Sequence, residues 1–228
     1  MRHLIILFVF NLFVSPIWLF AESSVEGRIV FKGSVPVSET IKIRSELPTC
    51  GKEKKISRLI LDKGNGVQNA VVTLVGVPIG TPPVSKEGFL DQVKCEFLPH
   101  VQVFPVGSIL KVTSSDPIIH NVHGFNEDGT TAFNINFPVV GSEIMTKIKR
   151  AGVIHVRCDS GHTWMNAYIV AINHPYYALT DSNGHFKIDG IPPGNYEIEV
   201  WHEWLGKHRE PITVEAEKNN VIDITLKK

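Results

Sequence analysis

The chain has 228 residues, enough for one large or two small domains with a buried core. Its 23 basic and 23 acidic residues balance, so the charge gives no support for a nucleic-acid or membrane-surface partner. The 18 glycines and 14 prolines separate short alternating runs, as is typical of all-β proteins with many turns.

The N-terminus has the pattern of a secretory signal peptide over residues 1–21. Two basic or polar residues precede the apolar run Leu4–Phe20, and polar residues follow Ala21 at once. Leu19 stands where a smaller residue is preferred, so an uncleaved N-terminal anchor is the alternative. We expect an exported protein, periplasmic or secreted to the cell surface, whose mature chain has no membrane span.

Short runs of period two predict strands along most of the chain. No stretch has a sustained helical period, so at most one short helix is expected. Two segments rich in polar and turn-forming residues, 76–88 and 126–131, are predicted loops. The predicted strands cover residues 24–31, 56–61, 70–75, 101–104, 109–113, 144–149, 153–156, 168–172, 177–180, 186–188, 196–201 and 221–226.

A thiolate, an imidazole and a thioether fall within eight residues as Cys158, His162 and Met165. The loop between the strands predicted at 153–156 and 168–172 can turn all three toward one point. A second imidazole is available upstream, where Asp116-Pro-Ile-Ile precedes His120. Two His and one Cys with a distant axial Met are the donors of a blue-copper electron-transfer site. Taken singly, a Cys-x3-His pair arises by chance and a Met on a strand fills a core.

The cysteine count agrees with this interpretation. Three Cys in an exported protein leave one unpaired in any disulfide scheme within one chain. If Cys158 is a metal ligand, Cys50 and Cys95 remain to form a disulfide in an oxidising compartment. The alternative is that these two are buried thiols that never meet.

Residues 22–172 resemble a cupredoxin, the Greek-key β-sandwich of plastocyanin-like blue copper proteins. The resemblance depends on Asp116-Pro-x-x-His120-Asn121 and on Cys158-x3-His162-x2-Met165. It implies one copper ion held by His120, Cys158, His162 and Met165.

The resemblance also implies details around the ligands. The residue after the first His commonly donates its backbone N–H to the Cys sulfur, and Asn121 has that position. A binuclear copper site would need a second Cys where Ile154 stands, so one copper is expected. Trp164 and Phe125 are candidates for an apolar shell that keeps water off the metal, or are plain core residues.

Other histidines are less informative. His123 lies an odd number of residues from His120, hence on the opposite face of a strand, and is expected at the rim of the site. His100 is expected to be structural, although a second, weaker metal site with His100 or His123 stays open. No paired carboxylates or Ser-His-Asp arrangement point to catalysis, so the protein is not expected to be an enzyme.

Residues 173–228 form a second expected domain. The turns Ser182-Asn183-Gly184 and Pro192-Pro193-Gly194 separate short alternating strands, a pattern that resembles the carboxypeptidase regulatory-like, or transthyretin-like, β-sandwich. The resemblance implies a noncatalytic module without site residues. Its usual opening strand is missing locally, and residues 24–31 and 70–75 look like the missing half. We therefore expect the two domains to share strands or to pack tightly.

The sequence thus predicts an all-β protein with a cupredoxin sandwich and an appended transthyretin-like sandwich. The predicted function is one-electron transfer through a single copper ion, with a redox partner protein of unknown identity. One alternative is a copper carrier without redox turnover. Another is an interaction or carbohydrate-binding scaffold that binds no metal.

Overall fold

The computed structural model describes residues 23–77, 84–137 and 141–228. In these residues it contains strands β1 to β19 and one four-residue helix, α1 (Leu47–Cys50). The all-β class expected from the alternating sequence is confirmed. The expected signal peptide and part of the expected 76–88 loop lie outside the described residues. No helix in the described ranges is both long and apolar enough to cross a membrane.

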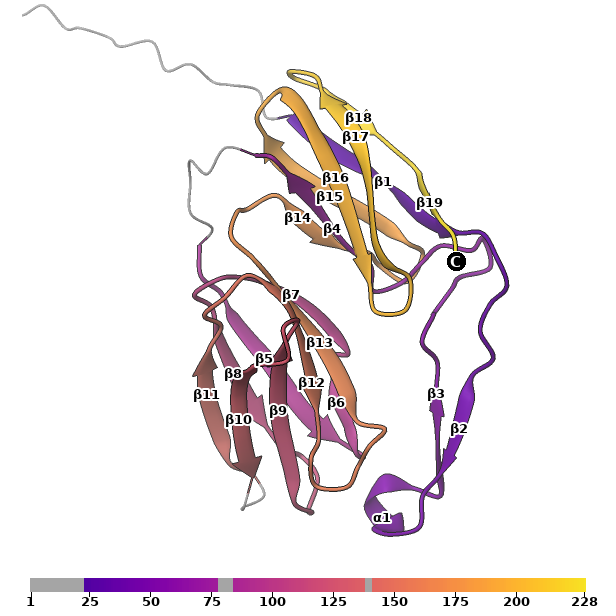
Figure 1. The fold of residues 1–228 in the computed structure, drawn as a ribbon, viewed down its shortest axis with the longest axis vertical. Coiled ribbons are helices and arrows are strands. Elements are labelled where there is room, and N and C mark those ends of the chain that lie inside the picture. Colours follow the sequence, from indigo (N-terminus) through magenta and orange to yellow (C-terminus); the bar gives the residue numbers. More distant parts are fainter. Residues whose placement is uncertain (1–22, 78–83, 138–140) are drawn as a thin grey trace, which may run out of the picture.

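Strands from both ends of the chain form one β-sandwich, called the terminal sandwich below (Figure 1). One sheet has the order β15–β1–β18, with β19 also paired to β1, and the other has the order β14–β4–β16–β17. The strands are β1 (Ser23–Phe31), β4 (Val71–Val75), β14 (Tyr177–Leu179), β15 (His185–Ile191), β16 (Gly194–His202), β17 (Gly206–Val214), β18 (Asn219–Val221) and β19 (Ile224–Leu226).

β1 holds the two ends of the chain together. Its alternating burial places Val25 and Ile29 in the core, and it runs parallel to β18 and β19 and antiparallel to β15. Gly27 allows the C-terminal segment to approach this strand, because a Cβ at residue 27 would lie 1.7 Å from the Ile222 carbonyl oxygen. A side chain at this position would therefore push the two segments apart.

The middle of the chain forms a second sandwich, called the central sandwich. Its sheets have the orders β10–β9–β12–β13–β7 and β11–β8–β5–β6. Their facing sides enclose one buried apolar cluster. The strands are β5 (Glu87–Val93), β6 (Glu96–Leu98), β7 (Val101–Pro105), β8 (Ile109–Thr113), β9 (His120–Asn126), β10 (Thr131–Phe137), β11 (Glu143–Lys147), β12 (Gly152–Arg157) and β13 (Asn166–Ile172).

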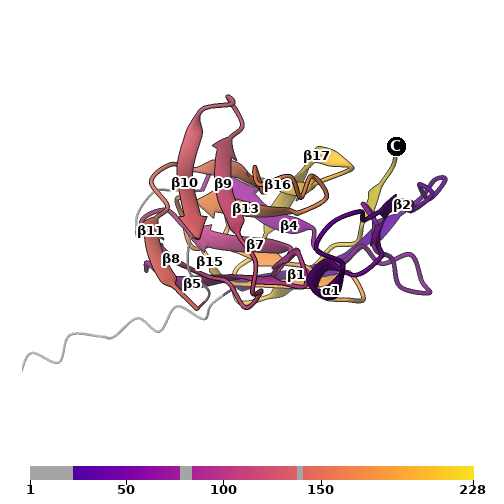
Figure 2. The ribbon, with the colours of Figure 1, turned by 90° about the horizontal axis from the view of Figure 1, so that it is seen from below.

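A hairpin between β1 and β4 leaves the terminal sandwich as an arm, defined as residues 39–56 (Figures 1 and 2). β2 (Glu39–Lys42) and β3 (Glu53–Ile56) pair antiparallel, and α1 lies at the tip. A disulfide joins Cys50 of α1 to Cys95 of the central sandwich, with 5.1 Å between the Cα atoms. The arm therefore reaches from one sandwich to the other.

The strand predicted at 56–61 is wrong. The structure ends β3 at Ile56, and Leu61 makes only an isolated bridge to Val67. The intervening turn is held by the Asp62 carboxylate, which accepts the backbone N–H groups of Gly64 and Gly66 at 2.9 and 2.6 Å. This local side-chain bonding competes with strand pairing, a competition that the alternating pattern does not reveal.

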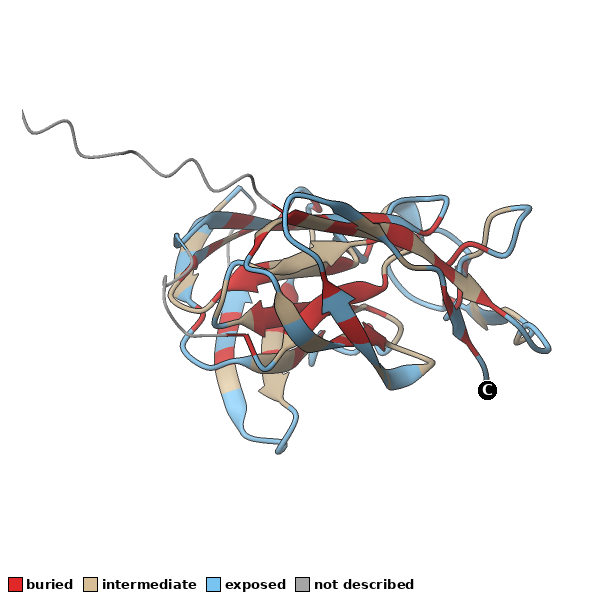
Figure 3. Ribbon diagram, turned by 90° about the horizontal axis from the view of Figure 1, so that it is seen from above, coloured by how far each residue is buried: buried red, intermediate tan, exposed pale blue. Residues whose placement is uncertain are grey.

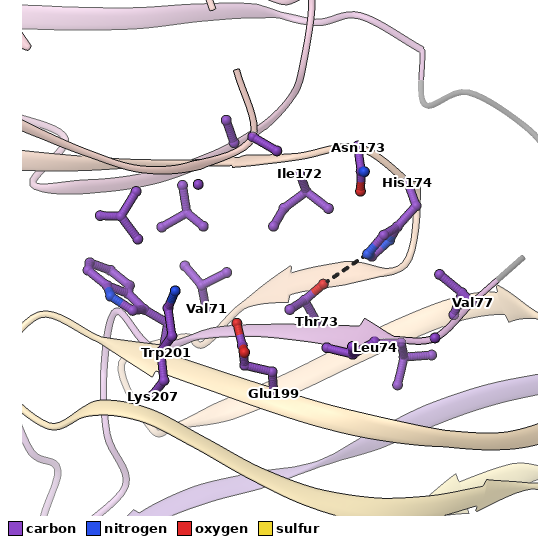
Figure 4. Close-up of a pocket in the computed structure, with 17 residues that line it drawn as sticks. Val71, Thr73, Leu74, Val77, Ile172, Asn173, His174, Glu199, Trp201 and Lys207 are labelled. Carbon is purple, nitrogen blue, oxygen red and sulfur yellow. Dashed lines mark hydrogen bonds between the residues drawn. The ribbon is translucent and has the colours of Figure 1, made fainter. Parts of the chain in front are cut away.

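The two sandwiches pack against each other. Val71 and Trp201 of the terminal sandwich meet Val101 and Val170 of the central sandwich in a small buried cluster. In Figure 3 most buried residues lie on strands and most exposed residues lie on the connecting loops. A cleft of about 420 Å³ lies beside this cluster (Figure 4). At its edge, Oγ1 of Thr73 lies 3.4 Å from Nε2 of His174.

The two sandwiches do not divide the chain at residue 172, the predicted domain boundary. Each sandwich is instead defined by which strands pair with one another. β1 and β4 precede every strand of the central sandwich, yet they pair with strands of the C-terminal segment. The central sandwich is thus inserted between β4 and β14. The arm is a second insertion, between β1 and β4.

Candidate metal centre

The metal-site residues predicted from two separated stretches lie at one end of the central sandwich. His120 is the first residue of β9, and Cys158 directly follows β12. β9 and β12 are antiparallel neighbours, with His123 paired to Arg157, so the start of one lies beside the end of the other. One ligand atom from each of His120, Cys158 and His162 lies within 4.8 Å of the other two.

Two imidazole nitrogens and a sulfur face one another at this end. Nδ1 of His120 lies 3.2 Å from Nδ1 of His162, which lies 3.6 Å from Sγ of Cys158. Nε2 of His120 lies 2.9 Å from the Asp116 carboxylate, and Nε2 of His162 contacts the Glu46 carboxylate. An ionised carboxylate only accepts hydrogen bonds, so it holds the proton of a neutral imidazole on Nε2 and leaves a lone pair on Nδ1.

This arrangement fits a soft metal ion. Two lone pairs and a sulfur converge in a buried space, where they repel one another unless a cation lies between them. His120, Cys158 and His162 are 0%, 5% and 3% exposed, so water screens this repulsion little. Imidazole nitrogen with thiolate sulfur is a donor set that suits copper.

Burial also fixes the protonation of the first imidazole. Burial lowers the pKa of His120, and the Asp116 carboxylate offsets this effect only in part. The ring is therefore neutral near pH 7, which is the form that binds a metal ion.

Met165 ends the loop that carries Cys158 and His162. Its backbone N–H donates to the His162 carbonyl at 2.9 Å, which closes the loop into a turn. The side chain is 1% exposed and belongs to the same buried cluster as Cys158. This position is compatible with the axial role that the resemblance implies.

Asn121 supports the sulfur as the resemblance implies. Its backbone N–H donates to Sγ of Cys158 at 3.4 Å. Its side-chain amide donates to Oδ1 of Asn134 and Oδ1 of Asn136 on β10, at 2.7 and 2.8 Å. The residue beside the first imidazole is thereby tied to the neighbouring strand, which fixes where its N–H points.

The two carboxylates that orient the imidazoles were not predicted from the sequence. Asp116 accepts the backbone N–H groups of Lys94 and Cys95 at 2.5 and 2.6 Å, which holds it beside His120. Its place four residues before His120 was the available signal. Glu46 comes from the arm, has a left-handed backbone with φ of 54°, and had no signal near the motif.

The disulfide leaves Cys158 as the one free cysteine of the described residues. Cys95 also connects the arm to the loop, because its carbonyl accepts the indole N–H of Trp164 at 3.0 Å. Trp164 in turn packs edge-on against the ring of His162, with centroids 5.3 Å apart. Phe125, the other residue expected in the apolar shell, packs instead against His123, with ring centroids 3.8 Å apart.

The two other candidate histidines, His100 and His123, have other partners. Nδ1 of His123 lies 2.6 Å from Asp159, and Nε2 of His100 lies 2.5 Å from Glu203. His202 is buried in β16. Neither His100, His123 nor His202 belongs to a potential metal-binding group in the described ranges.

A family comparison identifies one part of the chain. The model of the carboxypeptidase regulatory-like domain matches residues 154–227. Over these residues the chain is similar to the carboxypeptidase regulatory-like domain. The match to this regulatory-like domain begins within β12 of the central sandwich and does not include β1 and β4, which pair with its strands. No curated protein matches the chain.

The solved structures similar to the chain include cupredoxins. A purple cupredoxin from Nitrosopumilus maritimus is 19% identical, with 37% of this chain and 99% of that protein covered and a TM-score of 0.32. Amicyanin from Paracoccus versutus is 14% identical, with 44% and 97% covered and a TM-score of 0.33. A copper-containing nitrite reductase from Thermus scotoductus is 18% identical, with 44% of this chain and 25% of that enzyme covered and a TM-score of 0.32.

Proposed function

We propose that the protein binds one copper ion through His120, Cys158, His162 and Met165 and transfers single electrons. The observation that carries this proposal is the pair of imidazoles whose Nδ1 atoms face each other and the sulfur of Cys158, while carboxylates occupy both Nε2 atoms. A bound copper ion would supply reversible one-electron chemistry.

The chain's own residues would keep the site rigid. Asp116 and Glu46 orient the two imidazoles, and the Asn121 N–H stabilises negative charge on the sulfur. Burial excludes water from the donors. We also propose that the protein is not an enzyme, because donors this deeply buried leave no open position for a substrate.

The setting of this function is also a proposal. The N-terminal segment has the pattern of a signal peptide, so we propose an exported protein that exchanges electrons with another exported or membrane-bound protein. A disulfide between Cys50 and Cys95 suits an oxidising compartment.

A copper carrier is the second candidate, and one observation favours it. Electron exchange is easiest where an imidazole edge reaches the surface, but the His120 side chain is 0% exposed and the His162 side chain 4%. Glu46 of the arm contacts the outer nitrogen of His162. Such a covered site would suit retention of the metal.

A visible spectrum tests the proposal. The purified protein with one equivalent of Cu(II) should give an intense thiolate-to-copper band that a mild reductant bleaches and an oxidant restores. Cys158→Ser should lose the band, whereas Ser160→Ala, in the same loop, should keep it. A carrier would bind Cu(I) stoichiometrically with a weak band or none. Absence of stoichiometric binding of either ion would overturn both proposals and favour a scaffold.

A further inference from the structure

A second cavity adjoins the metal centre at Trp164 and Met165. It has a volume of about 660 Å³ and lies between the arm, the central sandwich and the turn between β16 and β17. Its lining includes Lys55, Arg157, Trp164, Tyr168 and Trp204, and we call it the aromatic pocket. Its volume is in the range of small-molecule sites, which often lie where domains meet.

The aromatic side chains of this pocket are held in place. Tyr168 stacks on His155 with centroids 4.7 Å apart and planes 6° apart. Trp164 is fixed by its indole hydrogen bond to Cys95. The ring of Trp204 has the Lys228 ammonium 4.0 Å from its centroid. Aromatic rings that are already immobilised bind a planar ligand at little cost in side-chain entropy.

The charges of the pocket are unequal. Each of its three carboxylates has a cationic partner: Glu96 with Lys54 at 2.6 Å, Glu203 with His100 at 2.5 Å and Glu39 with Arg58 at 3.8 Å. Lys55 and Arg157 have no carboxylate partner in the part of the chain that the structure describes. The pocket therefore has two unbalanced positive charges.

Two titratable residues add polarity without net charge. Burial, with a smaller contribution from Arg157, lowers the pKa of His155, so this imidazole is neutral at pH 7. Burial raises the pKa of Tyr168 to about 12, so its hydroxyl keeps its proton. Several shifted groups in one cavity are typical of a binding site, and here they support the geometric argument.

We propose that the aromatic pocket binds a small planar aromatic anion. The ring of the ligand lies among Trp164, Tyr168 and Trp204, and its acidic group meets Lys55 and Arg157. Trp164 and Met165 belong both to this pocket and to the metal centre. A ligand here would lie against the loop that carries the metal donors, although its binding does not depend on copper.

Three probes test recognition of the ring and recognition of the negative charge separately, in metal-free protein. Naphthalene-1-sulfonate has ring and charge, naphthalene-1-methanol has the ring alone, and octane-1-sulfonate has the charge alone. Calorimetric titration at low salt should give the tightest binding for the first, because only it satisfies both parts. Equal affinity for the charged and neutral naphthalenes, or no binding of the first probe at millimolar concentration, would overturn the proposal.

Substitutions locate the site. Lys55→Gln and Arg157→Gln should each weaken naphthalene-1-sulfonate binding by about two- to fivefold, and the double variant by roughly tenfold. Affinity for the neutral naphthalene should stay the same. Lys42→Gln is the matched control, since Lys42 is an exposed residue of the same arm outside the pocket. An equal loss in the control would show that the effect is general charge attraction and would overturn the assignment. Because no metal is added, the result is independent of the copper proposal.

Discussion

The carboxylate of Glu46 contacts Nε2 of His162, although 116 residues separate them in the sequence. Glu46 lies on the arm. Four residues after Glu46, Cys50 forms the disulfide that joins the arm to the central sandwich. An insertion of the terminal sandwich thus supplies an orienting group for a site in the central sandwich. The metal centre consequently depends on both sandwiches.

Glu46→Ala should weaken copper binding by about 10- to 100-fold, the usual effect of losing a partner that orients a metal-binding His. Glu46→Gln should retain most of the affinity, because its amide oxygen still accepts the imidazole N–H. Competition with a Cu(I) chelator of known affinity measures the copper affinity of both variants. Glu53→Ala is the control, an exposed carboxylate on the same arm. Wild-type affinity in Glu46→Ala would show that the contact does not position His162.

Met165→Leu should change the reduction potential more than the occupancy. The axial bond is weak, so copper should still bind, while loss of the sulfur donor should raise the potential by destabilising Cu(II). The exchange conserves volume and should cost less than about 1.5 kcal/mol of stability. Voltammetry and chelator competition give the two quantities. Met145→Leu, on the exposed side of β11, is the control. An unchanged potential in Met165→Leu would remove Met165 from the ligand set.

Residues 173–228 alone should not fold. Without β1, one sheet of the terminal sandwich loses the strand to which β15, β18 and β19 all pair, and without β4 the other loses the strand between β14 and β16. Circular dichroism of this fragment should lack a cooperative thermal transition, whereas the protein beginning at residue 22 should have one. Cooperative unfolding of the fragment would contradict the strand sharing.

The His100–Glu203 pair should stabilise the fold more in mild acid than in mild alkali. Burial opposes protonation of His100, but the Glu203 hydrogen bond and charge prevail and raise its pKa above 6.5. The stabilisation is therefore complete below pH 6.5 and is lost as the pH rises through the folded-state pKa. Burial lowers the pKa of His202 to about 4, which gives the opposite pH dependence, so a comparison between variants is required.

Urea unfolding of wild type and His100→Gln measures this contribution. The unfolding free energy of wild type minus that of His100→Gln should be about 1 kcal/mol larger at pH 5.5 than at pH 8.5. Glu203→Gln should reduce the same difference, because it removes the charge that raises the His100 pKa. Parallel pH curves for wild type and His100→Gln would refute the proposed linkage.

The all-β class was predictable because alternation and turn residues are local properties. Cys158, His162 and Met165 lie on one loop, so their grouping was also predictable. Their meeting with His120 required only that two strands be neighbours. Glu46 was not predictable, since its position depends on the path of the arm and on a disulfide. Strands β5 and β9 were missed because glycine and polar residues interrupt their apolar pattern. β10 was missed although Phe133, Ile135 and Phe137 alternate with asparagines.

The parallel pairing of β1 with β18 and β19 also has a consequence for folding. The first described strand finds its partners only when the last residues are available, and such distant pairings are slow to form because a long chain must first be closed into a loop. During synthesis the apolar face of β1 remains uncovered, and a strand in this state is prone to pair with other chains. A holding chaperone that shields the nascent N-terminal strand would therefore raise the yield of folded protein.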